Sequence, residues 1–169
     1  MTAAAVTRGV QKHEKCAVTI KHFACNNQET NRFGSNSMVS QRALREIYLK
    51  GFEICVKEAA PKAVMTSYNL LNGVHTANRR ELLTDVLRSE WGFEGIVMTD
   101  WGTTGDKFNL GVHGASSAVQ CILAGNDLIM PGAAEDVDSI LTGLQNSEIT
   151  RKELEACAGR ILALSGRLS

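Results

Sequence analysis

The sequence predicts an α/β fold in which the strands of a parallel sheet alternate with helices. Short apolar runs, which suit strands buried on both faces, are separated by segments with helical periodicity. The clearest run ends at an acid, Asp100, followed by Trp101 and Gly102. Because short junctions between strands and helices produce βαβ units, the strands should run parallel. Four strands are expected, near 17–21, 63–66, 95–98 and 127–130.

Helices are expected between and after these strands. Ser40 can cap a helix that runs to about Glu58, because apolar residues recur there at helical spacing and give one buried face. Gly92 and Gly125 can end two later helices. The remaining helices are expected near 2–12, 115–124, 134–145 and 151–165. Capping-box spacing occurs twice, at Asn78 with Glu81 and at Thr150 with Glu153.

Length and charge narrow the class of protein. The chain has 169 residues, the length of one domain, and a formal net charge of zero. This balance argues against nucleic acid or an anionic membrane as partner, since both attract basic proteins. No apolar stretch reaches membrane-spanning length, and the N-terminal residues lack the pattern of a secretory signal. We therefore expect a cytoplasmic protein.

The cysteines predict free thiols. Their number is odd and no Cys-x-x-Cys pair occurs, so buried thiols in a reducing compartment are the expected state. The histidines do not cluster with the cysteines in the sequence, which argues against a zinc site. The five cysteines are Cys16, Cys25, Cys55, Cys121 and Cys157.

Polar residues at the strand ends are the candidates for chemistry. Asp100 follows a buried strand, where α/β enzymes place catalytic groups, and it could act as nucleophile, base or metal ligand, or only brace a loop. Lys21 and His22 follow the first strand. An ammonium and an imidazole suit a polyol substrate, but the lysine could equally reach solvent and the histidine belong to the core. Asp127 stands at the start of its strand, so we interpret it as structural.

Two further segments carry weaker signals. The loop 26–32 is rich in amides and contains Arg32, groups that bind ring hydroxyls well, although an ordinary polar loop has the same composition. Tyr68 follows the second strand and could hydrogen-bond a catalytic carboxylate, or simply pack as an amphipathic side chain. No dinucleotide-binding, phosphate-binding, serine-hydrolase or zinc-protease motif occurs.

Five separated segments together resemble family 3 glycoside hydrolases, the β-glucosidase group. They occur in the family's order and cover nearly the whole chain. The resemblance implies an α/β fold that is the second half of a TIM-type (β/α)8 barrel. It also implies that residues 1–169 form a partial barrel domain, a fragment of a longer protein. The segments are 19–23, 26–29 with Arg32, 65–69 with 72–73, 98–102 and 124–132.

The resemblance further implies hydrolysis of terminal β-D-glucosidic bonds with retention of configuration. Asp100 resembles the nucleophile that forms the covalent glycosyl-enzyme. Lys21, His22 and Arg32 resemble the residues that bind the hydroxyls of the sugar being cleaved. Their positive charges would also favour the ionised form of Asp100.

Three more residues resemble parts of the same sugar subsite. Tyr68 is similar to the tyrosine beside the nucleophile, Met65 to a wall of the subsite and Trp101 to the adjoining aromatic. The expected ligand is a β-glucoside or an oligosaccharide.

A second carboxyl is the missing part of this expected site. A retaining glycosidase needs an acid/base about 5–5.5 Å from the nucleophile. In β-glucosidases of the family this glutamate comes from a later domain, so we expect it outside this chain and the isolated chain to be nearly inactive. The N-acetylglucosaminidase branch is disfavoured, because residues 24–28 lack the histidine loop that this branch carries.

Two alternatives belong to other classes. The chain could be a non-catalytic truncated barrel or interaction module, which would self-associate through its exposed half-barrel surface. It could also be a barrel lyase in which Lys21 forms a Schiff base, although this explains none of the other motifs.

Overall fold

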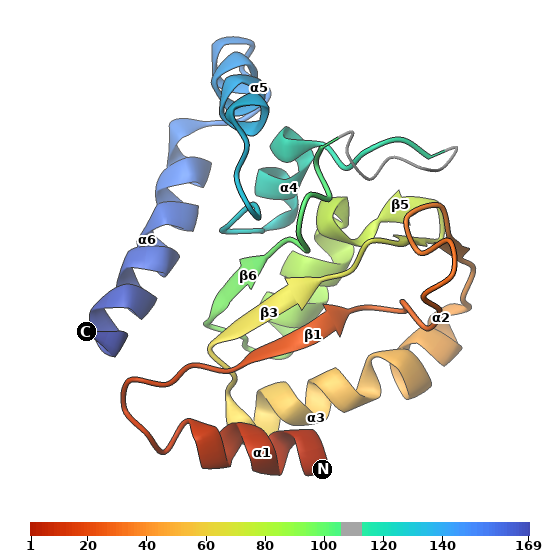
Figure 1. Ribbon diagram of the computed structural model, residues 1–169, viewed down its shortest axis with the longest axis vertical. Coiled ribbons are helices and arrows are strands. Elements are labelled where there is room, and N and C mark those ends of the chain that lie inside the picture. The colour runs from red at the N-terminus through yellow and green to blue at the C-terminus, as the bar shows by residue number, and fades with distance from the viewer. Residues whose placement is uncertain (106–112) are drawn as a thin grey trace.

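A parallel sheet lies at the centre of the molecule. The computed structural model describes residues 1–105 and 113–169. In it, β1 (Thr19–Phe23), β3 (Ala63–Thr66) and β6 (Ile96–Met98) form a parallel sheet in the order β1-β3-β6. Their carboxyl ends meet at one edge (Figure 1). β3 is central and buried along its whole length, as its apolar sequence predicts.

The segment expected as a fourth strand is reduced to a single bridge. Leu128 pairs in parallel with Met98, and the Leu128 carbonyl accepts from the Thr99 N–H at 3.0 Å. One reason is that the Asp127 side chain accepts from the Val97 N–H at 2.8 Å, so a carboxylate takes a place that a backbone carbonyl would hold in a ladder. The first strand is also shifted from its predicted range of 17–21, since β1 begins at Thr19.

A second, smaller sheet was not predicted. β2 (Asn36–Ser37), β4 (Leu70–Leu71) and β5 (Val74–His75) pair in that order beyond the ends of β1 and β3. β4 and β5 form a hairpin through Asn72 and Gly73, whose φ angles are +48° and +86°. Two positive φ angles define a type I′ turn, for which Asn-Gly is the preferred pair.

The main apolar core lies between the sheet and the helices that follow β1 and β3. The helical segment after Ser40 comprises α2 (Gln41–Ala43), the π-helical η1 (Leu44–Tyr48) and α3 (Lys50–Ala59), and the Ser40 hydroxyl caps it by accepting from the Ala43 N–H at 3.2 Å. After β5 comes η3 (Glu81–Glu90), also π-helical. Burial of each large side chain here contributes about 1.5–3 kcal/mol. Members of this core include Val64, Val97, Leu49, Val56, Leu83 and Leu87.

One of the two predicted capping boxes is wrong. No side chain caps η3; its first turn follows Arg80, and Asn78 is used elsewhere. The Asn78 amide donates to the Ser117 carbonyl at 2.9 Å and accepts from the Ser117 N–H at 3.0 Å, which joins η2 (Thr76–Asn78) to α4 (Ala118–Ala124). The box of Thr150 with Glu153 is confirmed at the start of α6 (Arg151–Leu168).

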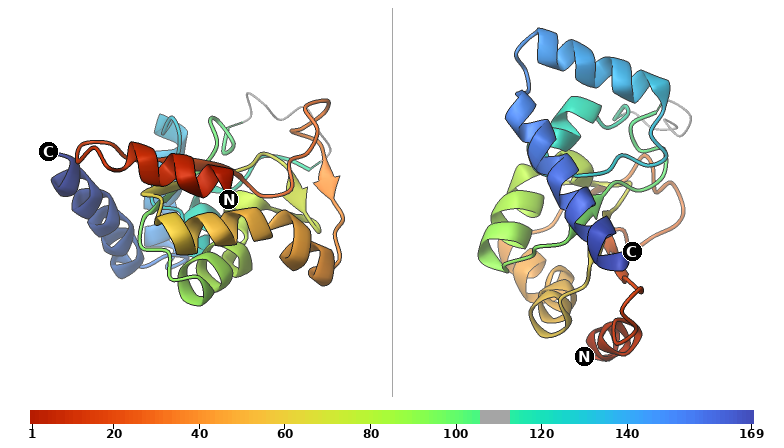
Figure 2. Two further views of the ribbon diagram at one scale, coloured as in Figure 1. Left: turned by 90° about the horizontal axis from the view of Figure 1, so that it is seen from below. Right: turned by 90° about the vertical axis from the view of Figure 1, so that its left-hand side faces the viewer.

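The other helices surround the sheet. α1 (Thr2–Val10) packs beside α3, as both views in Figure 2 show. α4 ends at Gly125, whose φ of +106° lies in the left-handed region that glycine adopts readily. α5 (Ala134–Gln145) and α6 close the described chain. Among the described residues, no helix is long and apolar enough to cross a membrane.

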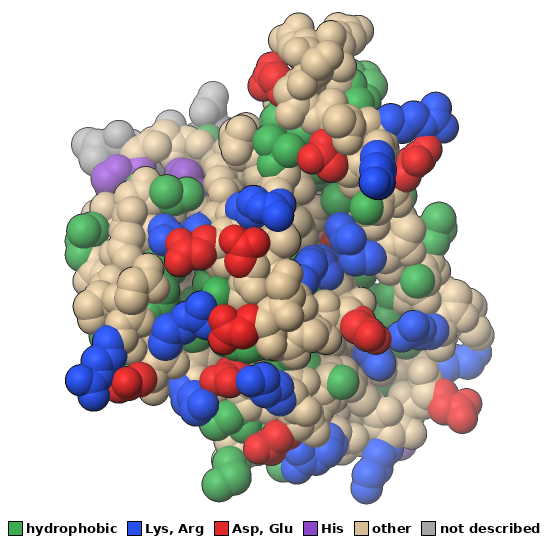
Figure 3. Space-filling view, turned by 180° about the vertical axis from the view of Figure 1, so that it is seen from behind, with side chains coloured by type: hydrophobic (Ala, Val, Ile, Leu, Met, Phe, Trp, Pro, Cys, Tyr) green, Lys and Arg blue, Asp and Glu red, His purple; other side chains and the backbone are tan. Residues whose placement is uncertain are grey.

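The surface and the thiols agree with the composition. Acidic and basic side chains are interspersed on the face shown in Figure 3. Exposed ion pairs of the described residues include Arg45 with Glu90. All five cysteines are free thiols; Cys16 is exposed and the other four are buried.

Candidate active site

Asp100 lies just beyond the carboxyl end of β6 and is only 5% exposed. Its Oδ1 accepts from the Trp101 N–H at 2.8 Å. Its Oδ2 lies 3.6 Å from Nε2 of His22, beyond hydrogen-bond distance. The carboxylate thus receives the Trp101 N–H and has the Tyr68 hydroxyl as a second hydrogen-bonding neighbour, and no lysine or arginine among residues 1–105 and 113–169 forms an ion pair with it.

A bulge in β1 directs His22 toward this carboxylate. Ile20 pairs with Val64 and Phe23 with Thr66, so two residues of β1 lie opposite Met65 alone. Bulges of this kind redirect a side chain and are frequent beside active sites. Two successive strand residues would otherwise point to opposite faces. The Lys21–His22 peptide bond within the bulge is cis.

The electrostatic surroundings of His22 keep its ring neutral near pH 7. Burial lowers its pKa below the usual 6.5, and the nearby charges of Lys21 and Arg32 lower it further. Asp100 opposes these effects and raises the pKa. A neutral imidazole offers one donor and one acceptor, which suits a hydroxyl group.

Tyr68 fixes the segment that follows Asp100. Its hydroxyl donates to the Trp101 carbonyl at 2.8 Å. Burial, together with the neighbouring Asp100 carboxylate, raises the pKa of Tyr68 to about 12. The phenol therefore stays protonated and can act as a donor at neutral pH.

Arg32 lies over the Tyr68 ring. Its guanidinium carbon is 4.7 Å from the Tyr68 ring centroid and 5.0 Å from that of Phe33, and the two rings are 4.4 Å apart. Arg32 also donates to Glu29 at 2.6 Å. The polar loop thus brings one cation, Arg32, beside Tyr68. Phe33, which was not among the candidates predicted from the sequence, contacts both side chains.

The remaining predicted residues lie around this group. Met65 is buried opposite the bulge and pairs with Met98 of β6. Trp101 is 51% exposed. Lys21 is exposed and lines the groove between α1 and β1, whereas His22 faces Asp100, so the two neighbours differ in direction.

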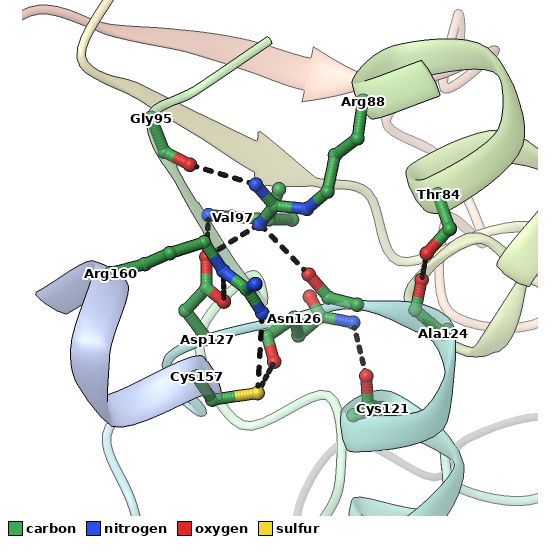
Figure 4. Close-up of polar contacts among 11 residues, drawn as sticks. Thr84, Arg88, Gly95, Val97, Cys121, Ala124, Asn126, Asp127, Cys157 and Arg160 are labelled. Atoms are coloured by element: carbon green, nitrogen blue, oxygen red, sulfur yellow. Dashed lines mark hydrogen bonds and ion pairs between the residues drawn. The ribbon is translucent and has the colours of Figure 1, made fainter. Parts of the chain in front are cut away.

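Asp127 contrasts with Asp100. Arg88 and Arg160 each donate to it at 2.6 Å, and the Val97 N–H donates at 2.8 Å (Figure 4). Arg88 also donates to the Gly95 carbonyl at 3.0 Å. The carboxylate is fully paired, which agrees with the structural role expected from its position.

Two further features of the site concern metal binding and buried polar side chains. Within residues 1–105 and 113–169, no three His, Cys, Asp or Glu side chains form a group that could hold a metal ion. Sequence reasoning missed Ser67 and Asn69, which flank Tyr68 and hydrogen-bond the Ala24 carbonyl. Because their partner, Ala24, is distant in the sequence, no local sequence pattern reveals these hydrogen bonds.

Comparisons with known proteins identify the family. A family model described as the glycosyl hydrolase family 3 N terminal domain matches residues 1–164. β-Glucosidase B of Emericella nidulans is 43% identical over 169 residues, which covers 99% of this chain and 19% of that protein. The chain belongs to glycoside hydrolase family 3. This agrees with the resemblance carried by its five segments.

Other members of family 3 give the same result. An exo-α-(1→6)-L-arabinopyranosidase of Bifidobacterium breve is 44% identical over 162 residues, 96% of this chain and 20% of its own. The structure of β-glucosidase 3B from Thermotoga neapolitana in complex with glucose is 41% identical, with a TM-score of 0.86 over 97% of this chain and 22% of that one. The chain thus spans about a fifth of the length of these family 3 relatives.

Proposed function

We propose that this chain carries the nucleophile and most of the sugar-binding residues of a retaining β-glucosidase. The observation that supports this most strongly is the state of Asp100. It is a buried carboxylate at the carboxyl end of a parallel strand, and its Oδ2 lies 3.6 Å from His22 Nε2 without a hydrogen bond. We assign Oδ2 as the attacking oxygen, because the Trp101 N–H holds Oδ1.

The proposed reaction has two displacements. The Asp100 oxygen forms a bond to the anomeric carbon as the bond to the leaving oxygen breaks, and that oxygen takes a proton from a second carboxyl group. Water, deprotonated by the same group, then attacks the anomeric carbon and releases Asp100 as carboxylate. We place the acid/base glutamate outside this chain. The reaction needs neither a metal nor an organic cofactor.

The neighbours of Asp100 would hold the sugar. His22, neutral near pH 7, would exchange hydrogen bonds with one hydroxyl, and Arg32 would donate to another. Lys21 would donate to a third only if its exposed ammonium turns from the groove between α1 and β1 toward Asp100. Trp101, half exposed, offers a flat apolar surface against a sugar ring. The Tyr68 hydroxyl, which has the Trp101 carbonyl and Asp100 as neighbours, would turn its single proton to the nucleophile, and its high pKa keeps that proton in place.

The fold proposed for the complete catalytic unit is a TIM-type (β/α)8 barrel, of which this chain supplies the second half. The parallel order β1-β3-β6, extended by the bridge at Leu128, is consistent with consecutive strands of such a barrel. The similarity to much longer family 3 enzymes supports the same arrangement.

β-Glucosides are the first substrate class, and arabinopyranosides are the second. Most of the named relatives above are β-glucosidases, but a family 3 arabinopyranosidase is equally similar. Parallel assays of the complete catalytic unit, with the other half of the barrel and the acid/base group, on nitrophenyl β-D-glucoside and nitrophenyl α-L-arabinopyranoside would distinguish them. We expect the glucoside to be preferred.

Turnover by the purified 169-residue chain tests the proposal that the acid/base group lies outside it. Without the acid/base group and the other half of the barrel, the chain should hydrolyse an aryl β-glucoside far below about 1 s⁻¹, the lower end of ordinary turnover numbers. Turnover at an ordinary rate would show that the chain contains a complete site and would overturn this part of the proposal.

The isolated chain should also self-associate. α1, β1 and η1 border an open groove of 690 Å³ whose lining is mostly apolar, and Val6 and Ile47 are 59% and 67% exposed there. Apolar surface on this scale favours association. Sedimentation velocity should show dimers or larger species at micromolar concentration, and a monodisperse monomer would contradict this.

A further inference from the structure

The backbone pairing between β1 and β3 is interrupted beside the site. The bulge places Lys21 and His22 opposite Met65, and pairing resumes at one pair, Phe23 with Thr66, where both strands end. His22 lies inside this bulge and Tyr68 lies just beyond β3. Their separation therefore depends on that last pair and on the contacts that follow it.

Two buried side chains hold the strand ends together immediately after this last backbone pair. Ser67 Oγ donates to the Ala24 carbonyl at 3.0 Å, and Asn69 Nδ2 donates to the same oxygen at 3.2 Å. Ala24, Ser67 and Asn69 are at most 1% exposed. We call this pair of hydrogen bonds the Ala24 clamp.

The Ala24 clamp is itself held by neighbouring segments. Thr76 donates to the Ser67 carbonyl at 2.6 Å and accepts from the Ser67 N–H at 3.1 Å. Asn69 Nδ2 also lies within hydrogen-bond distance of Ser37 Oγ, at 3.3 Å, and of the Leu70 carbonyl, at 3.1 Å. The clamp therefore links the ends of β1 and β3 to β2 and η2. Buried networks of this kind rigidify the groups that they connect.

The clamp acts on the site through chain connectivity. Ser67 and Asn69 flank Tyr68 and hydrogen-bond Ala24, whereas the Tyr68 hydroxyl reaches the Trp101 carbonyl. Ala24 lies two residues after His22. Fixing Ala24 against Ser67 and Asn69 thus fixes His22 relative to Tyr68, and both lie beside Asp100.

We propose that Asn69 and Ser67 are positioning residues, which hold His22 at its distance from Asp100 by clamping the Ala24 carbonyl. This deepens the proposed function, because it names what aligns the sugar-binding histidine with the nucleophile. The geometric claim can be tested without hydrolysis, so its outcome is independent of that of the proposed function.

The test measures the electrostatic coupling between His22 and Asp100. NMR titration of the histidine ring, assigned with a His22→Gln variant, gives the pKa of His22. In the otherwise unchanged chain, Asp100→Asn should lower this pKa, because the Asp100 charge raises it. In an Asn69→Ala background, Asp100→Asn should change the pKa much less, because His22 is no longer held near position 100.

The chain offers a matched control in Asn126. Like Asn69 it is 0% exposed, its Nδ2 donates to two backbone carbonyls, of Ala77 at 2.6 Å and Cys121 at 3.1 Å, and its Oδ1 has no hydrogen-bond partner among the described residues. Asn126→Ala should destabilise the fold similarly but leave the full effect of Asp100→Asn on the His22 pKa. A merely structural role for Asn69 would give both backgrounds the same coupling.

Ser67→Ala keeps the proposal testable if Asn69→Ala does not fold. It removes one of the two donors to the Ala24 carbonyl and leaves Asn69 in place, so the drop in the His22 pKa should shrink but persist. An undiminished drop in folded Asn69→Ala protein, or in folded Ser67→Ala protein if the first does not fold, would overturn the proposal.

Discussion

Asp100 and Asp127 are equally buried, at 5% and 6% exposure, but their surroundings are opposite. Asp127, at the start of its expected strand, receives two arginines at 2.6 Å and a backbone N–H. Asp100, at the carboxyl end of β6, receives one backbone N–H, has the Tyr68 hydroxyl as a hydrogen-bonding neighbour and lies 3.6 Å from His22, with no arginine paired to it among the described residues. Two arginines on one carboxylate join elements of the fold, whereas a carboxylate without them fits the nucleophile that we propose.

The comparison also explains how α6 is attached. Arg160 of α6 and Arg88 of η3 meet on Asp127, so one carboxylate joins two helices to the segment beside β6. Gly95 contributes to this end of the sheet, because a Cβ there would collide with the Lys62 carbonyl. The two ends of the sheet thus differ: one is fixed by charge pairing and the other carries the candidate chemistry.

Removing the two carboxylates should separate these roles most clearly. Asp127→Asn leaves the Arg88 and Arg160 charges without their anion, and loss of one partner of a buried pair costs about 3–5 kcal/mol. Asp100→Asn keeps an acceptor for the Trp101 N–H and should cost less than about 1 kcal/mol. Urea unfolding followed by circular dichroism measures both, and equal losses would contradict the assigned roles.

The two arginines should contribute unequally. Arg88 has a side chain 14% exposed and also donates to the carbonyls of Gly95 and Gly125, whereas that of Arg160 is 32% exposed. Arg88→Ala should cost about 3 kcal/mol, because it leaves Asp127 partly unpaired along with two carbonyls. Arg160→Ala should cost clearly less in the same urea experiment. The reverse order would show that α6, not η3, provides the main anchor.

Tyr68→Phe should have a smaller effect at the other end of the sheet. It removes the hydrogen bond to the Trp101 carbonyl and leaves the ring contacts with Arg32 and Phe33. A single hydrogen bond of this type contributes about 0.5–1.5 kcal/mol. A loss comparable with that of Asp127→Asn would mean that the segment after Asp100 is also a structural anchor.

The smallest expected effect is a dependence of stability on pH. Burial lowers the pKa values of His22 and His75 below 6.5. As the pH falls below 6.5, the unfolded chain binds protons that the folded chain does not, so the free energy of unfolding decreases until the folded pKa values are passed. Above pH 6.5 both states hold neutral rings and the contribution is fully present.

Histidine variants check this assignment. Unfolding at about pH 7.5 and about pH 5 should show a smaller loss of stability for His22→Gln and for His75→Gln than for the unchanged chain. An unchanged pH dependence in both buried-site variants would contradict the stated cause.

The sequence predicted features whose signals are local. Three buried apolar runs became parallel strands, Ser40 and Thr150 capped their helices, and Gly125 ended α4. The expectation that catalytic groups follow buried strands also selected Asp100, which the structure brings close to His22 and Tyr68. Asn72 with Gly73 carried a hairpin signal that could have revealed β4 and β5, although strands of two residues leave no periodicity to detect.

Features that depend on distant partners could not be predicted. The bulge at His22 exists only relative to the register of β3. Asn78 has the sequence of a helix cap, but Ser117, 39 positions later, captures both polar atoms of its side chain. Ser67 likewise finds Ala24 across 43 positions. In each case tertiary contacts decide between options that the local sequence leaves open.

Covalent trapping tests the central claim that Asp100, not Asp127, is the reactive carboxylate. The chain, first shown to bind glucose, is incubated with dinitrophenyl 2-deoxy-2-fluoro-β-D-glucoside, whose leaving group needs little protonation. Peptide mass spectrometry should locate one fluoroglycosyl group on Asp100, and Asp100→Asn should abolish it. A label on Asp127 or any other residue, or no label on a glucose-binding chain, would contradict the account.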